Sequence, residues 1–149
     1  MGTGSTEPGG PAWRQTTFFP FALTSQLATG ATLELKLDSD TYETSQYGTV
    51  PVVDAVATHD AEAGRTSVFL VNRSQTDDVT VTIDVAALGE ITVLDAQTLN
   101  DDADVYAANT LLEQERVSLR DNKSVVTEPG TVTVTLPPVS WSAISLGRV

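Results

Sequence analysis

The sequence predicts a mainly β fold, built as an antiparallel sandwich or barrel and preceded by one short helix. Three stretches alternate apolar and polar residues without interruption: Leu33–Asp38, Val79–Val85 and Thr131–Leu136. Successive side chains of a strand point to opposite faces, so a period of two indicates a strand with one buried and one solvated face. Several such strands spread along one chain build an antiparallel fold whose core consists of strand faces.

The first thirty residues divide into two parts. Residues 1–11 are rich in Gly, Thr, Ser and Pro, and we expect a flexible lead-in there. Residues 12–30 are expected to be helical, with Leu23 and Leu27 four positions apart and Gly30 at the position after the C-cap. Pro20 would begin the second part of this helix or kink it. Three of the four Phe residues of the chain fall within 18–21, so the helix needs a partner for its aromatic surface.

Residues 31–149 are expected to form the sandwich. The predicted strands are Thr32–Asp38, Val50–Thr58, Thr66–Asn72, Val79–Val85, Ile91–Leu94, Ser124–Val126, Thr131–Leu136 and Ser140–Leu146. Asp60–Gly64 is typical of a hairpin turn in which Gly64 adopts a positive φ. The polar segment Gln97–Lys123 has no clear period and is predicted to be a loop. The alternation changes phase in the last strand, which predicts a bulge near Ala143.

Composition restricts the partners and the compartment. The 149 residues include 20 acidic and 8 basic side chains, a net charge of −12, which disfavours nucleic acid and anionic membranes. The chain has no cysteine, which excludes disulfide and thiol chemistry. No apolar run approaches the roughly 18 residues of a membrane span, and the N-terminus does not resemble a signal peptide. We therefore expect a cytoplasmic protein with an acidic, solvated surface.

Two groups of residues invite a catalytic or metal-binding interpretation. His59 is the only histidine and precedes Asp60, but no serine or cysteine motif accompanies this pair, so a structural role at a strand end is favoured over half of a catalytic dyad. The run Asn100–Asp104 carries oxygen ligands at a density suited to calcium. It lacks the glycine and the glutamate that a calcium-binding loop places at its sixth and twelfth positions, which favours a solvated loop.

Aromatic side chains on the surface would suit sugar stacking. The candidates are Trp13, Tyr42, Tyr47, Tyr106 and Trp141. Trp141 lies in a terminal strand and is predicted to be buried. Tyr42 and Tyr47 flank a polar loop, which makes them the better surface candidates.

Several motifs resemble one family, the family 51 α-L-arabinofuranosidases. Residues 9–21 resemble the end of the catalytic barrel of that family. Further similar segments, in order along the chain, are Ser39 with Tyr42, Tyr47–Pro51 with Asp54 and Ala55, Phe69–Arg73, Ala108–Thr110 and Leu136–Trp141. Each match is short, but together they run from Gly9 to Gly147 at the spacing of the family.

The resemblance implies the C-terminal, jelly-roll β-sandwich of such an enzyme together with the last helical segment of its (β/α)₈ barrel. The family cleaves terminal arabinofuranosyl units with retention, using two glutamates that belong to the barrel. One of them follows an asparagine, and this chain contains no Asn-Glu pair. We therefore expect no catalytic residue, no metal and no cofactor here. The resemblance implies a contact between Gln15 and sugar in an intact enzyme; the alternative is a helix-start residue that bonds to the backbone. It also implies the catalytic barrel as partner and a homo-oligomer as the possible assembly. A carbohydrate-binding module is the alternative function.

Overall fold

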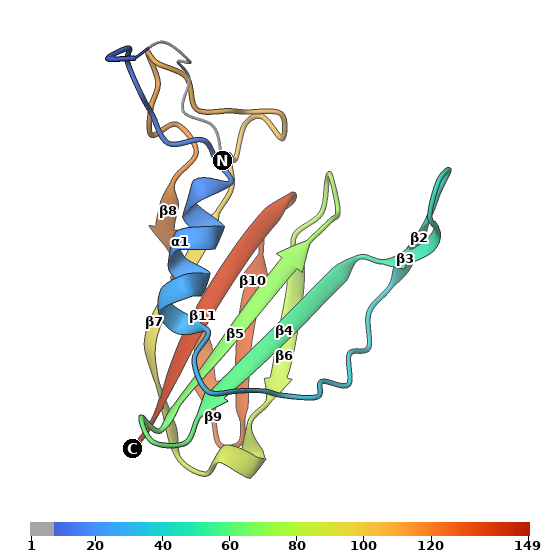
Figure 1. Ribbon diagram of the computed structural model, residues 1–149. Helices are drawn as coiled ribbons and strands as arrows, with labels where there is room; N and C mark the ends of the chain where they lie inside the picture. The colour runs from blue at the N-terminus through green and yellow to red at the C-terminus, as the bar shows by residue number, and fades with distance from the viewer. Residues whose placement is uncertain (1–7) are drawn as a thin grey trace.

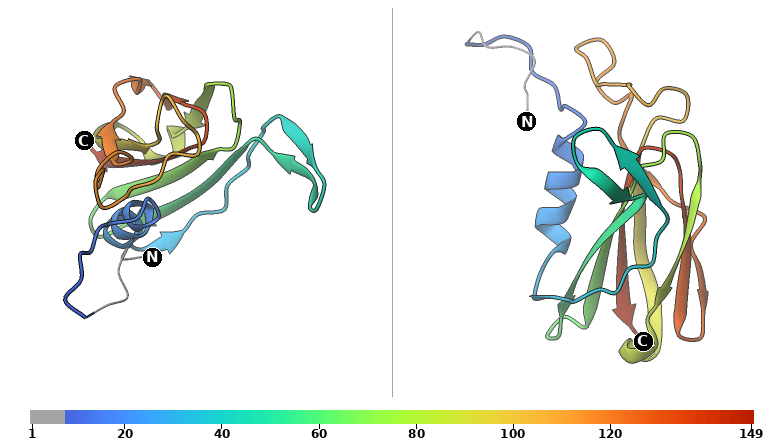
Figure 2. Two further views of the ribbon diagram at one scale, coloured as in Figure 1. Left: turned by 90° about the horizontal axis from the view of Figure 1, so that it is seen from above. Right: turned by 90° about the vertical axis from the view of Figure 1, so that its right-hand side faces the viewer.

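The computed structural model describes residues 8–149, in which one helix and eleven strands are arranged in layers. Helix α1 (Phe18–Leu27) lies on one face of a six-stranded sheet, and a three-stranded sheet covers the other face (Figure 1, and the right-hand view of Figure 2). This arrangement confirms the predicted mainly β sandwich with a short helix before it. Most of the predicted lead-in, residues 1–7, lies outside the described residues.

All paired strands are antiparallel. The six-stranded sheet has the order β1 (Ala31–Thr32), β4 (Val53–Asp60), β5 (Arg65–Asn72), β11 (Ser140–Arg148), β7 (Ile91–Leu99), β8 (Leu119–Asp121). The three-stranded sheet has the order β6 (Val79–Asp84), β10 (Thr131–Leu136), β9 (Val126–Glu128). Strands β2 (Thr41–Thr44) and β3 (Gly48–Pro51) form a separate hairpin that projects from the body (Figure 2). A single 3₁₀ turn (Ala86–Leu88) follows β6.

The core lies between the two larger sheets and follows the predicted alternation. Val132, Val134 and Leu136 of β10 are fully buried, whereas the threonines between them are half-buried. Leu70 of β5 and Ile144 of β11 belong to the same apolar cluster. Burying a large aliphatic side chain contributes roughly 1.5–3 kcal/mol, so this cluster is the main source of stability of the sandwich.

Strand β11 is buried on both faces, which explains its change of phase. Ile144 belongs to the core between the sheets, while Ala143 pairs with Phe69 of β5 on the face toward α1. On that face the Ser67 hydroxyl donates to the Leu27 carbonyl at the end of α1 (2.9 Å). The predicted bulge near Ala143 is therefore wrong: β11 keeps a regular register with β5. Its pairing with β7 shifts instead between Ser145 and Leu146.

Helix α1 begins at Phe18, so Pro20 lies in its first turn. The first backbone N–H groups of a helix have no partner inside it, so Pro20 removes no helical hydrogen bond and neither starts nor breaks the helix. Ala28 is the C-cap, so Gly30 is the second residue after the cap and not the first, as predicted. Its φ is +81°. In the described residues 8–149, no helix has the length and apolarity that crossing a membrane requires.

The most regular alternation near the N-terminus does not form the predicted strand. Strand β1 ends at Thr32, and one further backbone bond along this edge runs from Leu33 N to Ala57 O (2.9 Å). After Leu33 the chain leaves the sheet edge, so residues 34–38 have no strand to pair with. Leu35 and Leu37 are consequently exposed.

Three other predicted boundaries are also wrong. The predicted strand Val50–Thr58 is two strands, interrupted at Val52, whose N–H donates to Asp40 O (2.8 Å). Part of the predicted loop Gln97–Lys123 is strand, because β7 continues to Leu99 and β8 pairs with it. Residues 100–118 and 122–123 of the predicted segment lie outside the strands. The strand predicted at Ser124–Val126 is β9, displaced toward the C-terminus. The predicted hairpin turn at Asp60–Gly64 is confirmed, with Gly64 at φ of +60°.

Candidate functional site

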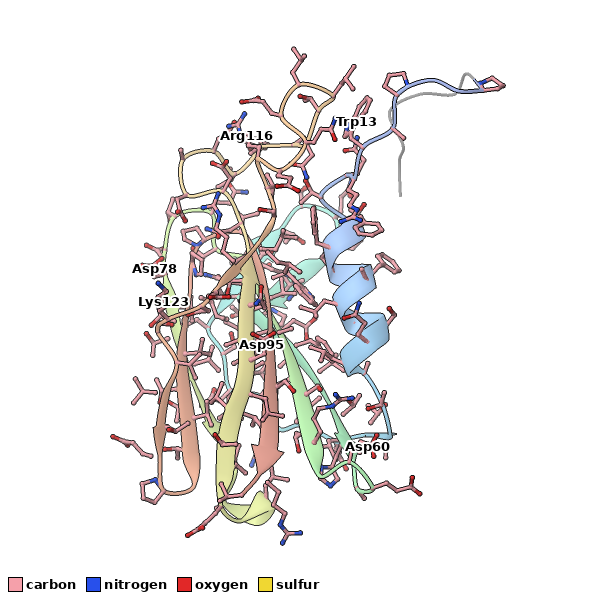
Figure 3. The ribbon with its side chains drawn as sticks, turned by 90° about the vertical axis from the view of Figure 1, so that its left-hand side faces the viewer. Trp13, Asp60, Asp78, Asp95, Arg116 and Lys123 are labelled. Atoms are coloured by element: carbon pink, nitrogen blue, oxygen red, sulfur yellow. The ribbon has the colours of Figure 1, made fainter. Side chains whose placement is uncertain are left out.

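The segment before α1 is attached to the 100–118 loop by one buried asparagine. The Asn109 side-chain amide donates to Arg14 O (3.1 Å) and to Val117 O (2.8 Å), and its oxygen accepts from Val117 N (2.8 Å). The Asn109 carbonyl accepts from the Trp13 indole Nε1 (3.0 Å). Figure 3 shows Trp13 and Arg116, a residue of this loop, at the same end of the molecule. Asn109 therefore positions the N-terminal segment, a role that its motif did not reveal.

Charges within the 100–118 loop are paired with each other. Arg116 bridges Asp101 (Nε–Oδ2, 3.3 Å) and Asp104 (Nη2–Oδ2, 3.2 Å). Asp101 Oδ1 also accepts from Ala103 N and Asp104 N. These hydrogen bonds, above all the one from Ala103, hold the pKa of Asp101 below its ordinary value of 3.8.

Side chains of the run Asn100–Asp104 bond to one another and to Arg116. Asn100 donates to Asp102 (2.8 Å), and Arg116 occupies carboxylate oxygens of the two other aspartates. Across residues 8–149, no group of three or more His, Cys, Asp or Glu side chains is placed to hold a metal ion. The run orders the loop through internal hydrogen bonds.

His59 and Asp60 do not form a dyad. The His59 ring Nδ1 lies 2.9 Å from Thr66 Oγ1, on the neighbouring strand β5. Asp60 Oδ1 instead accepts from Glu62 N (3.1 Å) and Ala63 N (3.0 Å) in the following turn. The bond from Ala63 is the main cause that lowers the pKa of Asp60 below 3.8. Both residues stabilise the β4–β5 hairpin, as the structural interpretation predicted.

Helix α1 has apolar residues on all sides. Phe18 and Phe19 contact each other edge to face (centroids 5.7 Å apart), and the Arg14 guanidinium lies 4.8 Å from the Phe18 ring centroid. The helix fully buries no residue, and Phe21 is 65% exposed. Apart from Thr24, Ser25 and Gln26, the residues of α1 are apolar. A helix with apolar residues on every side is normally packed against protein, whereas the sheet covers only one side of α1 (Figure 2). Its outer face is therefore a surface suited to a second partner.

The aromatic candidates do not form a single platform. Trp141 is half-buried and stacks on Phe69 with centroids 6.0 Å apart, so the prediction of burial is only partly correct. Trp13 is bonded to the loop, and Tyr106 is exposed within it. Tyr42 and Tyr47 line one surface hollow beside the β2–β3 hairpin, together with Arg73 of the chain after β5. The sequence indicated the two tyrosines but gave no sign that Arg73 lines the same hollow.

Gln15 lies in the N-terminal segment, half-buried, just before α1. Its backbone carbonyl accepts from Phe18 N (2.9 Å) and so begins the helix. The sugar contact of the Gln15 side chain stays a prediction.

Comparison with known proteins gives these surfaces a context. A family profile described as the alpha-L-arabinofuranosidase C-terminal domain matches residues 3–140. The chain is 51% identical over 142 residues to an exo-α-(1→6)-L-arabinofuranosidase of Bifidobacterium longum, a match covering 93% of this chain and 27% of that protein. It is 42% identical over 139 residues to an intracellular exo-α-(1→5)-L-arabinofuranosidase of Streptomyces lividans, with 93% and 21% covered.

Solved structures of α-L-arabinofuranosidases also resemble this chain. A family 51 α-L-arabinofuranosidase from Bifidobacterium longum superposes with a TM-score of 0.85 at 39% identity, covering 93% of this chain and 27% of that one. The α-L-arabinofuranosidase of Thermotoga maritima superposes with a TM-score of 0.78 at 20% identity, covering 93% and 30%, and supports the fold alone. The chain thus spans less than a third of the length of these relatives. The profile match over residues 3–140 confirms the resemblance found in the motifs, and the chain belongs to the family of α-L-arabinofuranosidase C-terminal domains.

Proposed function

We propose that this chain is the non-catalytic C-terminal β-sandwich of a longer α-L-arabinofuranosidase, where it supports and assembles the catalytic domain. The carrying observation is the family match over residues 3–140, together with relatives that are more than three times as long. Two relatives are named for release of α-(1→6)- or α-(1→5)-linked arabinofuranosyl units. The substrate of the whole protein is accordingly an arabinose-containing polysaccharide or oligosaccharide.

The proposed roles of the two domains follow from the chemistry of retaining hydrolysis. Retaining hydrolysis needs two carboxyl groups about 5–5.5 Å apart, one as nucleophile and one as acid/base. A (β/α)₈ barrel presents such groups at the ends of its strands. In this proposal the barrel supplies both carboxyl groups, and Gln15 contributes at most a contact to the bound sugar.

The proposed docking surface for the barrel is the outer face of α1. Phe21 exposes 65% of its area there, and apolar residues continue around the helix. Covering this face with the barrel would remove a large aromatic side chain from water, an effect worth roughly 1.5–3 kcal/mol for a residue of this size. The Trp13–Asn109 bond attaches the N-terminal segment, which in this proposal follows the barrel, to the 100–118 loop.

The test compares two variants in two contexts. Phe21→Glu should leave the thermal midpoint of the 149-residue chain almost unchanged, because this side chain is already largely exposed. In the intact enzyme it should lower the midpoint clearly, because it places a charge in the domain interface. Gln26→Glu, at an exposed position of the same helix, is the matched control and should be mild in both contexts.

An equal effect of Phe21→Glu in the chain and in the intact enzyme would contradict docking through α1.

The proposal extends to a cytoplasmic enzyme, because one of these relatives is named intracellular, and to a homo-oligomer that buries further apolar surface. Light scattering on the intact protein measures its oligomeric state.

A further inference from the structure

A surface hollow of about 460 Å³ lies where the β2–β3 hairpin meets the start of β4. Its lining residues are Tyr42, Thr44, Tyr47, Val50, Pro51, Asp54 and Arg73. The volume lies within the roughly 300–1,000 Å³ range of small-molecule sites. Aromatic and aliphatic surface surrounds one charged pair, a combination typical of sites that orient a ligand with few polar groups. Figure 1 shows the hairpin extending away from the body, and the side chains of Tyr42 and Tyr47 are both exposed.

Hydrogen bonds fix the turn that carries Tyr47 and the guanidinium of Arg73. The Thr44 hydroxyl accepts from Tyr47 N (2.9 Å) and donates to Gly48 O (3.0 Å), which closes the turn that carries Tyr47. Arg73 donates from Nη1 to Pro51 O (3.1 Å) and from Nη2 to Asp54 Oδ2 (2.8 Å). A site whose side chains are already ordered loses less conformational entropy on binding.

The charge balance selects a neutral ligand. The Arg73 guanidinium is matched by Asp54 within the hollow, and the chain carries a net charge of −12, so an anion would gain little there. Arg73 retains N–H donors beyond its two bonds, and Asp54 retains acceptor capacity. Together they can bind the hydroxyl groups of a sugar, while the faces of Tyr42 and Tyr47 offer apolar surface to its C–H groups.

We propose that this hollow binds the neutral sugar units of an arabinose-containing chain, with Tyr47 as the principal stacking residue. The choice of arabinose rests on the proposed function, whereas the choice of a neutral polyhydroxylated ligand rests on the hollow itself. Tyr47 is the principal residue because 78% of its area is exposed, against 40% for Tyr42. The site would hold polymeric substrate on the enzyme.

The experiment is affinity electrophoresis of the 149-residue chain in gels containing linear α-(1→5)-arabinan. We expect retardation of the wild-type chain, with affinity about five- to tenfold weaker for Tyr47→Ala and weaker also for Tyr42→Ala. Tyr106→Ala is the matched control, because Tyr106 is equally exposed (83%) but belongs to the 100–118 loop. Circular dichroism of each variant verifies that the fold is retained.

Retardation that Tyr47→Ala reduces and Tyr106→Ala leaves unchanged supports the site. Absence of retardation, or equal retardation of the wild type and Tyr47→Ala, overturns it. Equal retardation in hydroxyethyl cellulose overturns the assignment to arabinose. An assay of the intact enzyme on an aryl α-L-arabinofuranoside separates the two proposals: hydrolysis without arabinan binding by this chain defeats only the hollow, and absence of hydrolysis defeats the proposed function.

Discussion

Trp13 and Asn109 are 96 positions apart in the sequence, yet the indole Nε1 of Trp13 donates to the carbonyl oxygen of Asn109 at 3.0 Å. The side-chain amide of Asn109 then spans Arg14 and Val117. This arrangement joins the segment before α1 to a loop that contains no regular secondary structure. The 100–118 loop thus anchors the segment before α1, a role that its irregular sequence pattern does not indicate.

Replacing this asparagine should therefore be costly. Asn109→Ala leaves the buried Val117 N–H without its acceptor and two carbonyls without their donor, so we expect unfolding free energy to fall by about 2–4 kcal/mol. Urea unfolding followed by tryptophan fluorescence measures the loss. Gln114→Ala removes an exposed amide from the same loop and should change stability by less than about 0.5 kcal/mol. Similar losses for both variants would show that Asn109 is not the attachment point.

Two leucines test where the core lies. Leu136 of β10 is fully buried, whereas Leu112 in the 100–118 loop is 93% exposed. Leu136→Ala should destabilise the chain by about 2–5 kcal/mol through lost burial and the resulting cavity. Leu112→Ala should be within about 0.5 kcal/mol of the wild type. Comparable denaturant midpoints for the two variants would refute a core placed between the sheets.

Two glycines with positive φ differ in the space around them. A Cβ at Gly30 would clash with the His59 carbonyl oxygen, whereas a Cβ at Gly48 meets nothing within 4 Å. Gly30→Ala should cost about 2–4 kcal/mol, because backbone strain adds to a clash with the β4 backbone. Gly48→Ala should cost only about 1 kcal/mol, from strain alone. Thermal melts of both variants measure the difference, and equal losses would mean that the chain after α1 does not pass so close to β4.

The lowered pKa of Asp101 determines how this residue makes the stability of the chain depend on pH. Its pKa is lower in the folded chain than the ordinary 3.8, so its contribution to stability is complete above that value and is lost as pH falls through the folded pKa. Asp101→Asn should therefore make stability less dependent on pH below about pH 4. Because the Ala103 N–H is the largest cause, Arg116→Gln should keep most of the wild-type dependence. Urea midpoints between about pH 2 and 5 check both, and an unchanged slope for Asp101→Asn would contradict the assignment.

The sequence predicts an element well where burial alternates with a period of two. Strands β6 and β10 follow their patterns because one face of each lies on the core. Strand β11 departs from the pattern because it is buried on both faces, between the small sheet and α1. Strand β8 has only three residues and gives no periodic signal.

Residues 33–38 have a clear strand pattern but do not form the predicted strand. Their alternation is regular, but the pattern of one segment does not say whether another strand is available to pair with it. The candidate site likewise depends on contacts between segments that are distant in the sequence. The Tyr42–Tyr47 pair could be found locally, whereas Arg73 and the Trp13–Asn109 bond join segments that only the fold brings together.

The most direct test of a sandwich without sugar-cleaving machinery is the release of p-nitrophenol from p-nitrophenyl α-L-arabinofuranoside by the purified 149-residue chain. The account predicts a rate equal to that of buffer, while the intact enzyme assayed beside it turns over. Release by the chain alone, at a rate that rises in proportion to its concentration, would contradict the account.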